Sequence, residues 1–227
     1  MLDFLKGCIG FVIELIYPMH CVICGAKADN YICPDCRENV HIIPPEYQQG
    51  FRPFRGEKNV SHMHVAFDYD ADTRALIHSF KYRRNEFLAP TVSSLMNRAI
   101  PNILFLEECD LIIPVPMHPY DLKRRGFNQS ELLARSVAEE TKIPMAADVL
   151  VKTKITPHQA SLTTEERYKN LEGAFAVTEP EKINGLTVLL IDDVATTGTT
   201  MNECAKALLA AGAKRVNGFA ATSSRVI

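Results

Sequence analysis

One short stretch of the chain, from Val188 to Thr200, constrains the fold more than any other part of the sequence. It begins with four consecutive apolar residues, Val188 to Ile191, which are too few for a typical helix and suit a strand buried on both faces. Asp192 and Asp193 follow at the carboxyl end of this strand, where open α/β sheets bind their ligands. The stretch therefore predicts an α/β sheet with two carboxylates at its ligand-binding edge.

The residues after the two acids form a loop of small hydroxylated side chains ahead of a helix-like segment. Gly198 permits a tight turn, and four threonines around it provide hydroxyl groups beside backbone N–H groups. Because the amino end of a helix is electropositive, a phosphate group is well placed on such a loop. The loop therefore predicts an anion site next to the two carboxylates.

Three interpretations of this stretch compete. The Walker B element of an ATPase also ends a strand in acids, but the chain has no GxxxxGK[ST] loop and the loop here has no lysine. An ordinary strand-to-helix turn with a Thr N-cap explains one hydroxyl, but not two acids followed by four threonines. The stretch closely resembles the phosphoribosyl pyrophosphate (PRPP) motif of type I phosphoribosyltransferases, which combines four apolar residues, two acids and a Thr/Gly phosphate loop.

This resemblance implies roles that suit the chemistry of the side chains. The carboxylates of Asp192 and Asp193, expected as the catalytic pair, accept charge-assisted hydrogen bonds from the two ribose hydroxyls. The sugar 5'-phosphate is expected on the loop, because N–H groups and hydroxyls suit it better than acids do. The expected 5'-phosphate site comprises Ala195, Thr196, Thr197, Gly198, Thr199 and Thr200.

Composition and charge indicate a globular protein without a general affinity for anionic partners. The 227 residues, 47% hydrophobic and 23% charged, suffice for a main domain and a small appendage, and the net charge is −2.

Residues 1–17 are apolar enough to suggest a signal peptide, but Asp3, Lys6 and Glu14 interrupt them and no small-residue cleavage site follows. We expect an amphipathic helix there, no stable membrane insertion and a cytoplasmic protein, with membrane-surface binding as the alternative.

Two CxxC pairs near the start of the chain, separated by eight residues, predict a metal site. Four thiolates around a tetrahedral Zn²⁺ leave no open position, so the expected zinc is structural; its ligands are Cys21, Cys24, Cys33 and Cys36. Disulfides would require an oxidising compartment, and an iron–sulfur cluster is the other alternative.

The chain divides into three parts by composition. We expect an N-terminal helix and zinc ribbon over residues 1–40, a linker rich in Pro, Gly and Gln over 41–60, and the main domain over 61–227.

The main domain alternates strand-like and helix-like segments, which predicts a mainly parallel sheet flanked by helices. We expect strands at 62–69, 110–115, 188–191 and 216–222. Asp72 is the expected N-cap of a first helix that ends in the basic residues 81–84. Further helices are expected over 87–100, from Ser130, and over 204–211.

Several segments narrow the resemblance to one family. PVPMHP at 114–119, RRGFNQSELLA at 124–134 and HQASLTTEERYKNLEGAF at 158–175, together with the CxxC pairs, resemble the ComF family (ComFC type). Members of this family are zinc-ribbon-bearing, type I phosphoribosyltransferase-like proteins of bacterial competence. The resemblance covers nearly the whole chain, and it implies the same fold here.

The family resemblance also implies a pyrophosphate site and a reaction. The loop after PVP is expected to meet the pyrophosphate, with basic side chains such as Lys123 nearby. Pyrophosphate would leave C1 of PRPP, with Mg²⁺ held mainly by the diphosphate, the ribose hydroxyls and water. Residues 151–175 resemble a hood that excludes water, although no catalytic role is carried onto Lys152 or Lys154. The expected pyrophosphate site comprises Val115, Pro116, Met117, His118, Arg124, Arg125 and Lys81.

Two classes of function remain open, because the sequence displays neither a base-recognition pocket nor an obvious general base. As an enzyme in natural transformation, the protein would transfer ribose 5-phosphate from PRPP to an unknown acceptor; nucleobase salvage is a related alternative. As a binding module, it would sense PRPP or a nucleotide and contact single-stranded DNA or a competence DNA helicase. The basic clusters 81–84 and 123–125 motivate the DNA contact, with solvated helix ends as the alternative.

Overall fold

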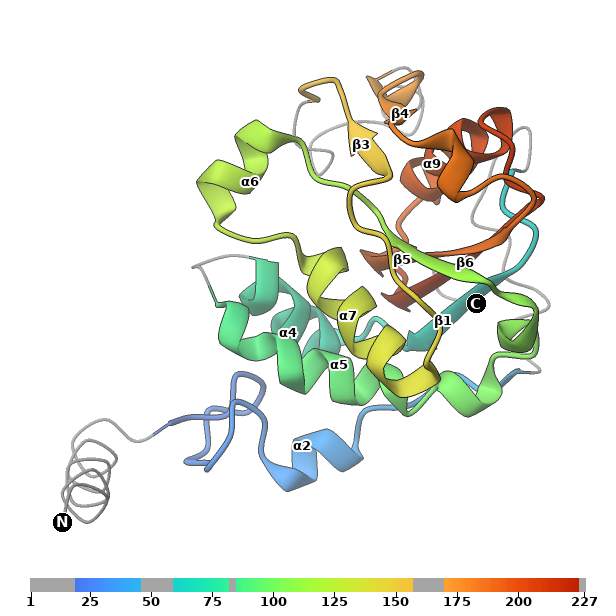
Figure 1. Ribbon diagram of the computed structural model, residues 1–227. Coiled ribbons are helices and arrows are strands. Elements are labelled where there is room, and N and C mark those ends of the chain that lie inside the picture. The colour runs from blue at the N-terminus through green and yellow to red at the C-terminus, as the bar shows by residue number, and fades with distance from the viewer. Residues whose placement is uncertain (1–18, 46–58, 82–84, 157–169, 225–227) are drawn as a thin grey trace, which may run out of the picture.

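The computed structural model of the protein describes residues 19–45, 59–81, 85–156 and 170–224 (Figure 1). The expected N-terminal amphipathic helix, the basic residues 82–84 and the segment 157–169 lie outside these ranges. Among the described residues, no helix is both long and apolar enough to cross a bilayer.

A four-stranded parallel sheet with the strand order β1-β6-β5-β2 forms the centre of the main domain. All four expected strands are present, so the predicted α/β fold is confirmed. In a parallel sheet the carboxyl ends of all strands lie at one edge, which brings the residues that follow β2 and β5 together. The strands are β1 (Met63–Phe67), β2 (Leu111–Pro114), β5 (Thr187–Val194) and β6 (Arg215–Thr222).

Helices cover both faces of this sheet (Figure 1). Alternate side chains of β5 point to opposite faces: Leu189 and Ile191 pack in one core with α4, α5 and α7, whereas Val188 and Leu190 pack in the other with α9. Burial on both faces explains why β5 is apolar throughout its middle. The helices are α4 (Ala71–Lys81), α5 (Ala89–Asn97), α6 (Pro119–Arg125), α7 (Gln129–Thr141) and α9 (Thr199–Ala210), and the 3-10 helices are η1 (Glu86–Leu88), η2 (Ile100–Asn102), η3 (Leu106–Glu108) and η5 (Pro180–Lys182).

A small antiparallel pair flanks the polar stretch that was expected to form a hood. Strand β3 (Leu150–Lys152) pairs with β4 (Phe175–Val177). The end that leads into β4 is fixed to α9, since the backbone N–H of Gly173 donates to Oε2 of Glu203 at 3.3 Å. This pair places both ends of the stretch near the start of α9.

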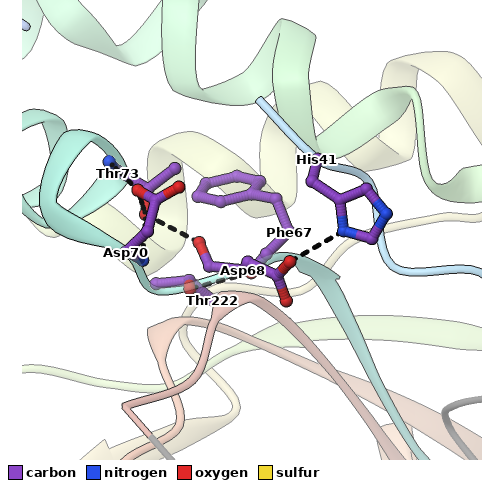
Figure 2. Close-up of polar contacts among 6 residues, drawn as sticks. All are labelled: His41, Phe67, Asp68, Asp70, Thr73 and Thr222. Atoms are coloured by element: carbon purple, nitrogen blue, oxygen red, sulfur yellow. Dashed lines mark hydrogen bonds and ion pairs between the residues drawn. The ribbon is translucent and has the colours of Figure 1, made fainter. Parts of the chain in front are cut away.

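The start of α4 differs from the prediction. The carboxylate of Asp70, and not that of Asp72, caps the helix: its Oδ1 accepts from the backbone N–H of Thr73 at 2.8 Å (Figure 2). The Thr73 hydroxyl in turn donates to the carbonyl of Asp68 at 2.7 Å. Asp72 lies in the first turn of α4 instead. Asp70 is the acid that stands three residues before Thr73, the spacing at which an N-cap side chain accepts from a backbone N–H. This corner fixes the direction of α4, whose last residue reaches the candidate site.

The cysteine-rich N-terminal module packs against the same core as α4, α5 and α7. It contains the short helix α2 (Pro34–Glu38). The first residues of the segment expected as a linker then join the edge of the sheet: Ile42 pairs with β1, and the N–H of Ile43 donates to the carbonyl of Ala66 at 2.9 Å. His41 Nδ1 lies 2.7 Å from Oδ2 of Asp68 (Figure 2). Residues 46–58 lie outside the described part of the chain.

Candidate functional site

A cavity of about 310 Å³ opens at the carboxyl edge of the sheet, between the ends of β2 and β5 and the starts of α7 and α9. This is the edge at which the sequence predicted ligand binding. Most of the predicted site residues meet there, although they come from four separate segments of the chain. Those that line the cavity are Lys81, Val115, Pro116, Met117, Arg125, Asp192, Asp193, Ala195, Thr196, Gly198 and Thr200.

The two acids lie within β5, which continues to Val194 instead of ending at Ile191 as expected. Each acid is held by a different helix. Asp192 Oδ1 accepts from the Ser130 hydroxyl of α7 at 2.9 Å, and Asp193 Oδ1 lies 3.0 Å from the ammonium Nζ of Lys81 at the end of α4. Both carboxylates are almost fully buried. The acid pair is therefore rigidly placed and partly neutralised.

Burial and mutual repulsion dominate the electrostatics of this cluster. Burial raises the pKa of Asp192 to about 7, and the neighbouring charge of Asp193 adds to the rise, while Lys81 and the Ser130 hydroxyl oppose it. Burial alone would lower the pKa of Lys81, but the charges of Asp193 and Asp192 outweigh it and the pKa is raised. At neutral pH Asp192 is thus divided between its protonated and ionised forms. A ligand that brings a cation or hydroxyl donors shifts it toward the ionised form.

The loop after β5 forms a closed turn ahead of α9. Gly198 has a positive φ of 73° and takes the N-cap position, a conformation that glycine adopts without strain. The hydroxyls of Thr197 and Thr199 lie 2.8 Å apart, and neither residue lines the cavity. Thr196 and Thr200 line it together with Gly198. The loop thus turns only part of the predicted phosphate site toward the cavity, at the electropositive end of a helix of 12 residues.

The basic residues after PVP belong to a helix that was not predicted. Pro119 occupies the first turn of α6 and Gly126 ends it with a positive φ of 98°, which are standard start and stop signals for a helix. His118 caps this helix, since its Nδ1 accepts from the backbone N–H of Tyr120 at 3.1 Å. Arg125 lines the cavity, whereas His118 and Arg124 do not. Arg124 instead points its guanidinium toward Asp121, at 3.5 Å.

The start of α7 supplies three residues that sequence reasoning missed. Asn128 caps the helix and donates from Nδ2 to the carbonyl of Val115 at 3.1 Å, which ties α7 to the PVP loop. Gln129 Oε1 accepts from Nη1 of Arg125 at 2.7 Å. With Ser130 on Asp192, three consecutive side chains each contact a different residue that lines the cavity. The signal that would have revealed them is their position at the start of the helix expected from Ser130, shortly after the PVP loop.

Lys152 also lines the cavity, from the end of β3. Its Nζ donates to Oγ1 of Thr156 at 2.7 Å. Burial lowers the pKa of Lys152, and the carboxylate of Asp121 opposes this effect. The further lining residues that were not predicted are Asp121, Thr156, Val194 and Met201.

The N-terminal cysteines converge on one point away from this cavity. The four sulfur atoms of Cys21, Cys24, Cys33 and Cys36 all lie within 4.8 Å of one another, and none of the four is disulfide-bonded. A tetrahedral Zn²⁺ with Zn–S bonds of about 2.3 Å separates its sulfur ligands by about 3.8 Å. The Cys24 and Cys33 sulfurs are 3.8 Å apart, whereas a disulfide needs about 2 Å. The donor set therefore fits a closed tetrahedral metal site.

Comparisons with known proteins agree with both parts of this architecture. The double zinc ribbon domain family matches residues 12–47, and the phosphoribosyl transferase domain family matches residues 123–222. The "DNA utilization protein YhgH" of Escherichia coli O157:H7 is 30% identical over 204 residues, which cover 86% of each chain. "Competence protein F" of Haemophilus influenzae is 26% identical over 217 residues, 88% of this chain and 95% of the relative.

The chain belongs to the ComF family. A further member, "Competence protein ComFC" of Bacillus subtilis, is 23% identical over 196 residues, 85% of this chain and 78% of that protein. The resemblance identified from the sequence is thus confirmed, together with a phosphoribosyltransferase-like domain and an N-terminal zinc ribbon. This ComF protein carries the four-cysteine cluster within the matched ribbon and the acid pair within the matched phosphoribosyl transferase domain.

Proposed function

We propose that this ComF protein binds Mg-PRPP in the cavity at the carboxyl edge of its sheet and transfers the ribose 5-phosphate group to an acceptor in natural transformation. The observation that carries the proposal is the continuity of Asp192, Asp193 and the Thr/Gly loop, which together line one wall of a single cavity. Two carboxylates followed by an anion-binding turn match a sugar that carries vicinal hydroxyls and a 5'-phosphate. The competence-related names of the relatives support the biological setting.

The ribose hydroxyls bind the acid pair. Each carboxylate accepts one hydroxyl hydrogen, and such charge-assisted bonds are stronger than neutral ones. Binding draws Asp192 into its ionised form, because the ribose hydroxyls add hydrogen-bond donors to a carboxyl whose pKa burial raises to about 7. Lys81, 3.0 Å from Asp193, limits the repulsion between the two charges when the site is empty. The 5'-phosphate then lies on the loop, above the first turn of α9.

The pyrophosphate lies toward the PVP loop and Arg125, which also line the cavity. During transfer the bond between C1 and the pyrophosphate oxygen breaks, the electron pair leaves with pyrophosphate, and the acceptor nucleophile bonds to C1 as it loses its proton. Mg²⁺ bound with the ligand would neutralise charge on the leaving pyrophosphate. One oxygen of each acid already contacts Ser130 or Lys81. The metal would therefore be held mainly by the diphosphate, the ribose hydroxyls and water.

A screen for pyrophosphate release tests the proposed reaction. The full chain is incubated with PRPP and Mg²⁺, with nucleobases and single-stranded DNA as candidate acceptors. Release that requires an acceptor supports the transferase, and the acceptor that stimulates it identifies the substrate class. Mg-dependent binding of PRPP without release, for every acceptor, supports a binding module instead.

The binding-module alternative is favoured by one surface feature, the short helix α6. Its Tyr120 is 61% exposed, and the same helix carries Lys123 and Arg124. An exposed ring beside cations suits weak binding of single-stranded DNA, in which bases stack and phosphates follow the charges. In this version of the proposal the DNA, or a competence DNA helicase, contacts α6 next to the cavity.

The ribbon in this proposal holds one structural Zn²⁺ through Cys21, Cys24, Cys33 and Cys36. The convergence of the four sulfurs supports it, because four thiolates leave no position for substrate or water. The metal would fix the module that packs against the core beside α4 and α5. It would take no part in the reaction at the cavity.

A further inference from the structure

The first residue of α7, Gln129, has an unused hydrogen-bond donor at the wall of the cavity. Its side chain is only 1% exposed and lines the cavity. Oε1 accepts from Nη1 of Arg125 at 2.7 Å, whereas Nε2 is buried with no hydrogen-bond partner among the residues that the structure describes. Because a guanidinium only donates, Oε1 must face Arg125, and the amide orientation is fixed. A buried amide donor without an acceptor is rare in proteins and unfavourable.

The neighbours of Gln129 show what kind of group this donor would meet. Asn128 is bound to the carbonyl of Val115, on the wall where the proposed pyrophosphate lies, and Ser130 is bound to Asp192, on the ribose side. Gln129 therefore lies between the two halves of the proposed ligand. Its partner Arg125 is a cation on the same wall.

We propose that Gln129 selects a diphosphate over a monophosphate: Oε1 holds the Arg125 guanidinium at the cavity wall, and Nε2 donates to an oxygen of the pyrophosphate group that Arg125 binds. This inference rests on the proposed function and adds a residue that determines its ligand class. A phosphoryl oxygen bridging Arg125 and Gln129 supplies the acceptor that the amide lacks. A neutral donor suits this position, because a carboxylate there would repel the anion.

Calorimetry with three probes tests the inference, each in the presence of Mg²⁺: PRPP, inorganic pyrophosphate and ribose 5-phosphate. Gln129→Glu keeps the length of the side chain and the acceptor for Arg125, but replaces the donor by a negative charge. We expect binding of PRPP and of pyrophosphate to weaken by about tenfold or more, since the lost bond is to a charged group. Binding of ribose 5-phosphate should not change. Gln129→Met removes both the hydrogen-bond donor and the acceptor without burying a charge. It should likewise weaken binding of PRPP and pyrophosphate and leave binding of ribose 5-phosphate unchanged.

A matched control separates this role from a general effect on folding. Asn97 in α5 is also an amide with a buried atom, Oδ1, that lacks a partner among the described residues, and its Nδ2 donates to Ser136 of α7 at 3.1 Å. It does not line the cavity, so Asn97→Asp should leave all three affinities unchanged. An equal loss of affinity for all three probes in the Gln129 variants, or no loss at all, would overturn the inference. Wild-type protein that binds pyrophosphate but not PRPP would instead refute the proposed function while leaving the role of Gln129 measurable; binding of neither would refute both.

Discussion

Replacing Lys81 by methionine should destabilise the protein in a pH-dependent way. The ammonium of Lys81 lies 3.0 Å from Asp193, and the two side chains are 26% and 9% exposed. Methionine keeps an unbranched apolar side chain that can cover the same core surface, so the main loss is the charge. Removing one partner of a fully buried ion pair costs about 3–5 kcal/mol, and an exposed pair contributes about 1 kcal/mol or less. Because Lys81 is a quarter exposed, we expect a loss of about 2–3 kcal/mol at pH 8.

The pH dependence follows from Asp192. Burial, with the charge of Asp193, raises its pKa from 3.8 to about 7, and the charge of Lys81 works against this rise. A raised pKa in the folded state means that the contribution of the carboxyl to stability is fully present below the unfolded pKa and is lost as the pH rises through the folded pKa. Without Lys81 the folded pKa of Asp192 is higher still, so the additional loss falls above pH 7. At pH 5.5 Asp192 is mostly protonated in both proteins and adds little difference.

Urea unfolding followed by far-ultraviolet circular dichroism, at pH 5.5 and pH 8, measures both quantities. Lys182→Met is the matched control, because Lys182 is exposed and pairs with Glu179 and Asp148 at the surface. We expect no clear pH-dependent loss of stability for this control. A Lys81→Met variant that loses the same free energy of unfolding at both pH values would refute the assigned coupling between Lys81 and the acid pair.

Three further predictions concern the ribbon, the acid pair and α6. Elemental analysis of protein purified without added metal should find about one zinc per chain. The Cys33→Ser variant should contain less zinc, and its main domain should stay folded. Iron with visible absorbance would contradict the zinc assignment. Ser130→Ala removes a hydrogen-bond donor to Asp192 and should raise the pKa of Asp192 further. The pH at the midpoint of a plot of Mg-PRPP affinity against pH should therefore move upward. An unchanged midpoint would exclude coupling between Ser130, Asp192 and the ligand. Fluorescence anisotropy with a labelled single-stranded oligonucleotide should show weak binding, with a slope of log binding constant against log salt concentration of about −0.7 per neutralised phosphate. Tyr120→Ala or Lys123→Ala should weaken this binding. A flat anisotropy response at all salt concentrations would leave no direct DNA contact.

The sequence predicted the parts of the fold that depend on local patterns. The apolar run before Asp192 and the alternation of strand-like and helix-like segments were sufficient to predict the parallel sheet. A strand buried on both faces must be apolar along its length, and this pattern is visible in the sequence. The two CxxC pairs likewise predicted where four sulfurs meet. Boundaries were less predictable: β5 continues through both acids, since its backbone pairing with β6 extends to Val194.

The contacts within the site depend on tertiary packing and were not predictable from local patterns. Lys81 was expected at the pyrophosphate, yet its ammonium lies on Asp193, because the capped corner before α4 directs the end of that helix to β5. The short helix α6 was missed although Pro119 and Gly126 delimit it, since seven residues carry little periodicity. Its formation directs Arg125 into the cavity and leaves Arg124 outside it.

Isothermal titration calorimetry of PRPP, with and without Mg²⁺, tests whether the cavity binds this ligand. We expect saturable binding at one site per chain that requires Mg²⁺. Asp193→Asn, which keeps the shape of the side chain but removes its charge, should weaken this binding by about 1–3 kcal/mol while the protein stays folded. Absence of saturable binding to the wild-type protein would contradict the proposed ligand, and unchanged affinity in folded Asp193→Asn would remove Asp193 from the site.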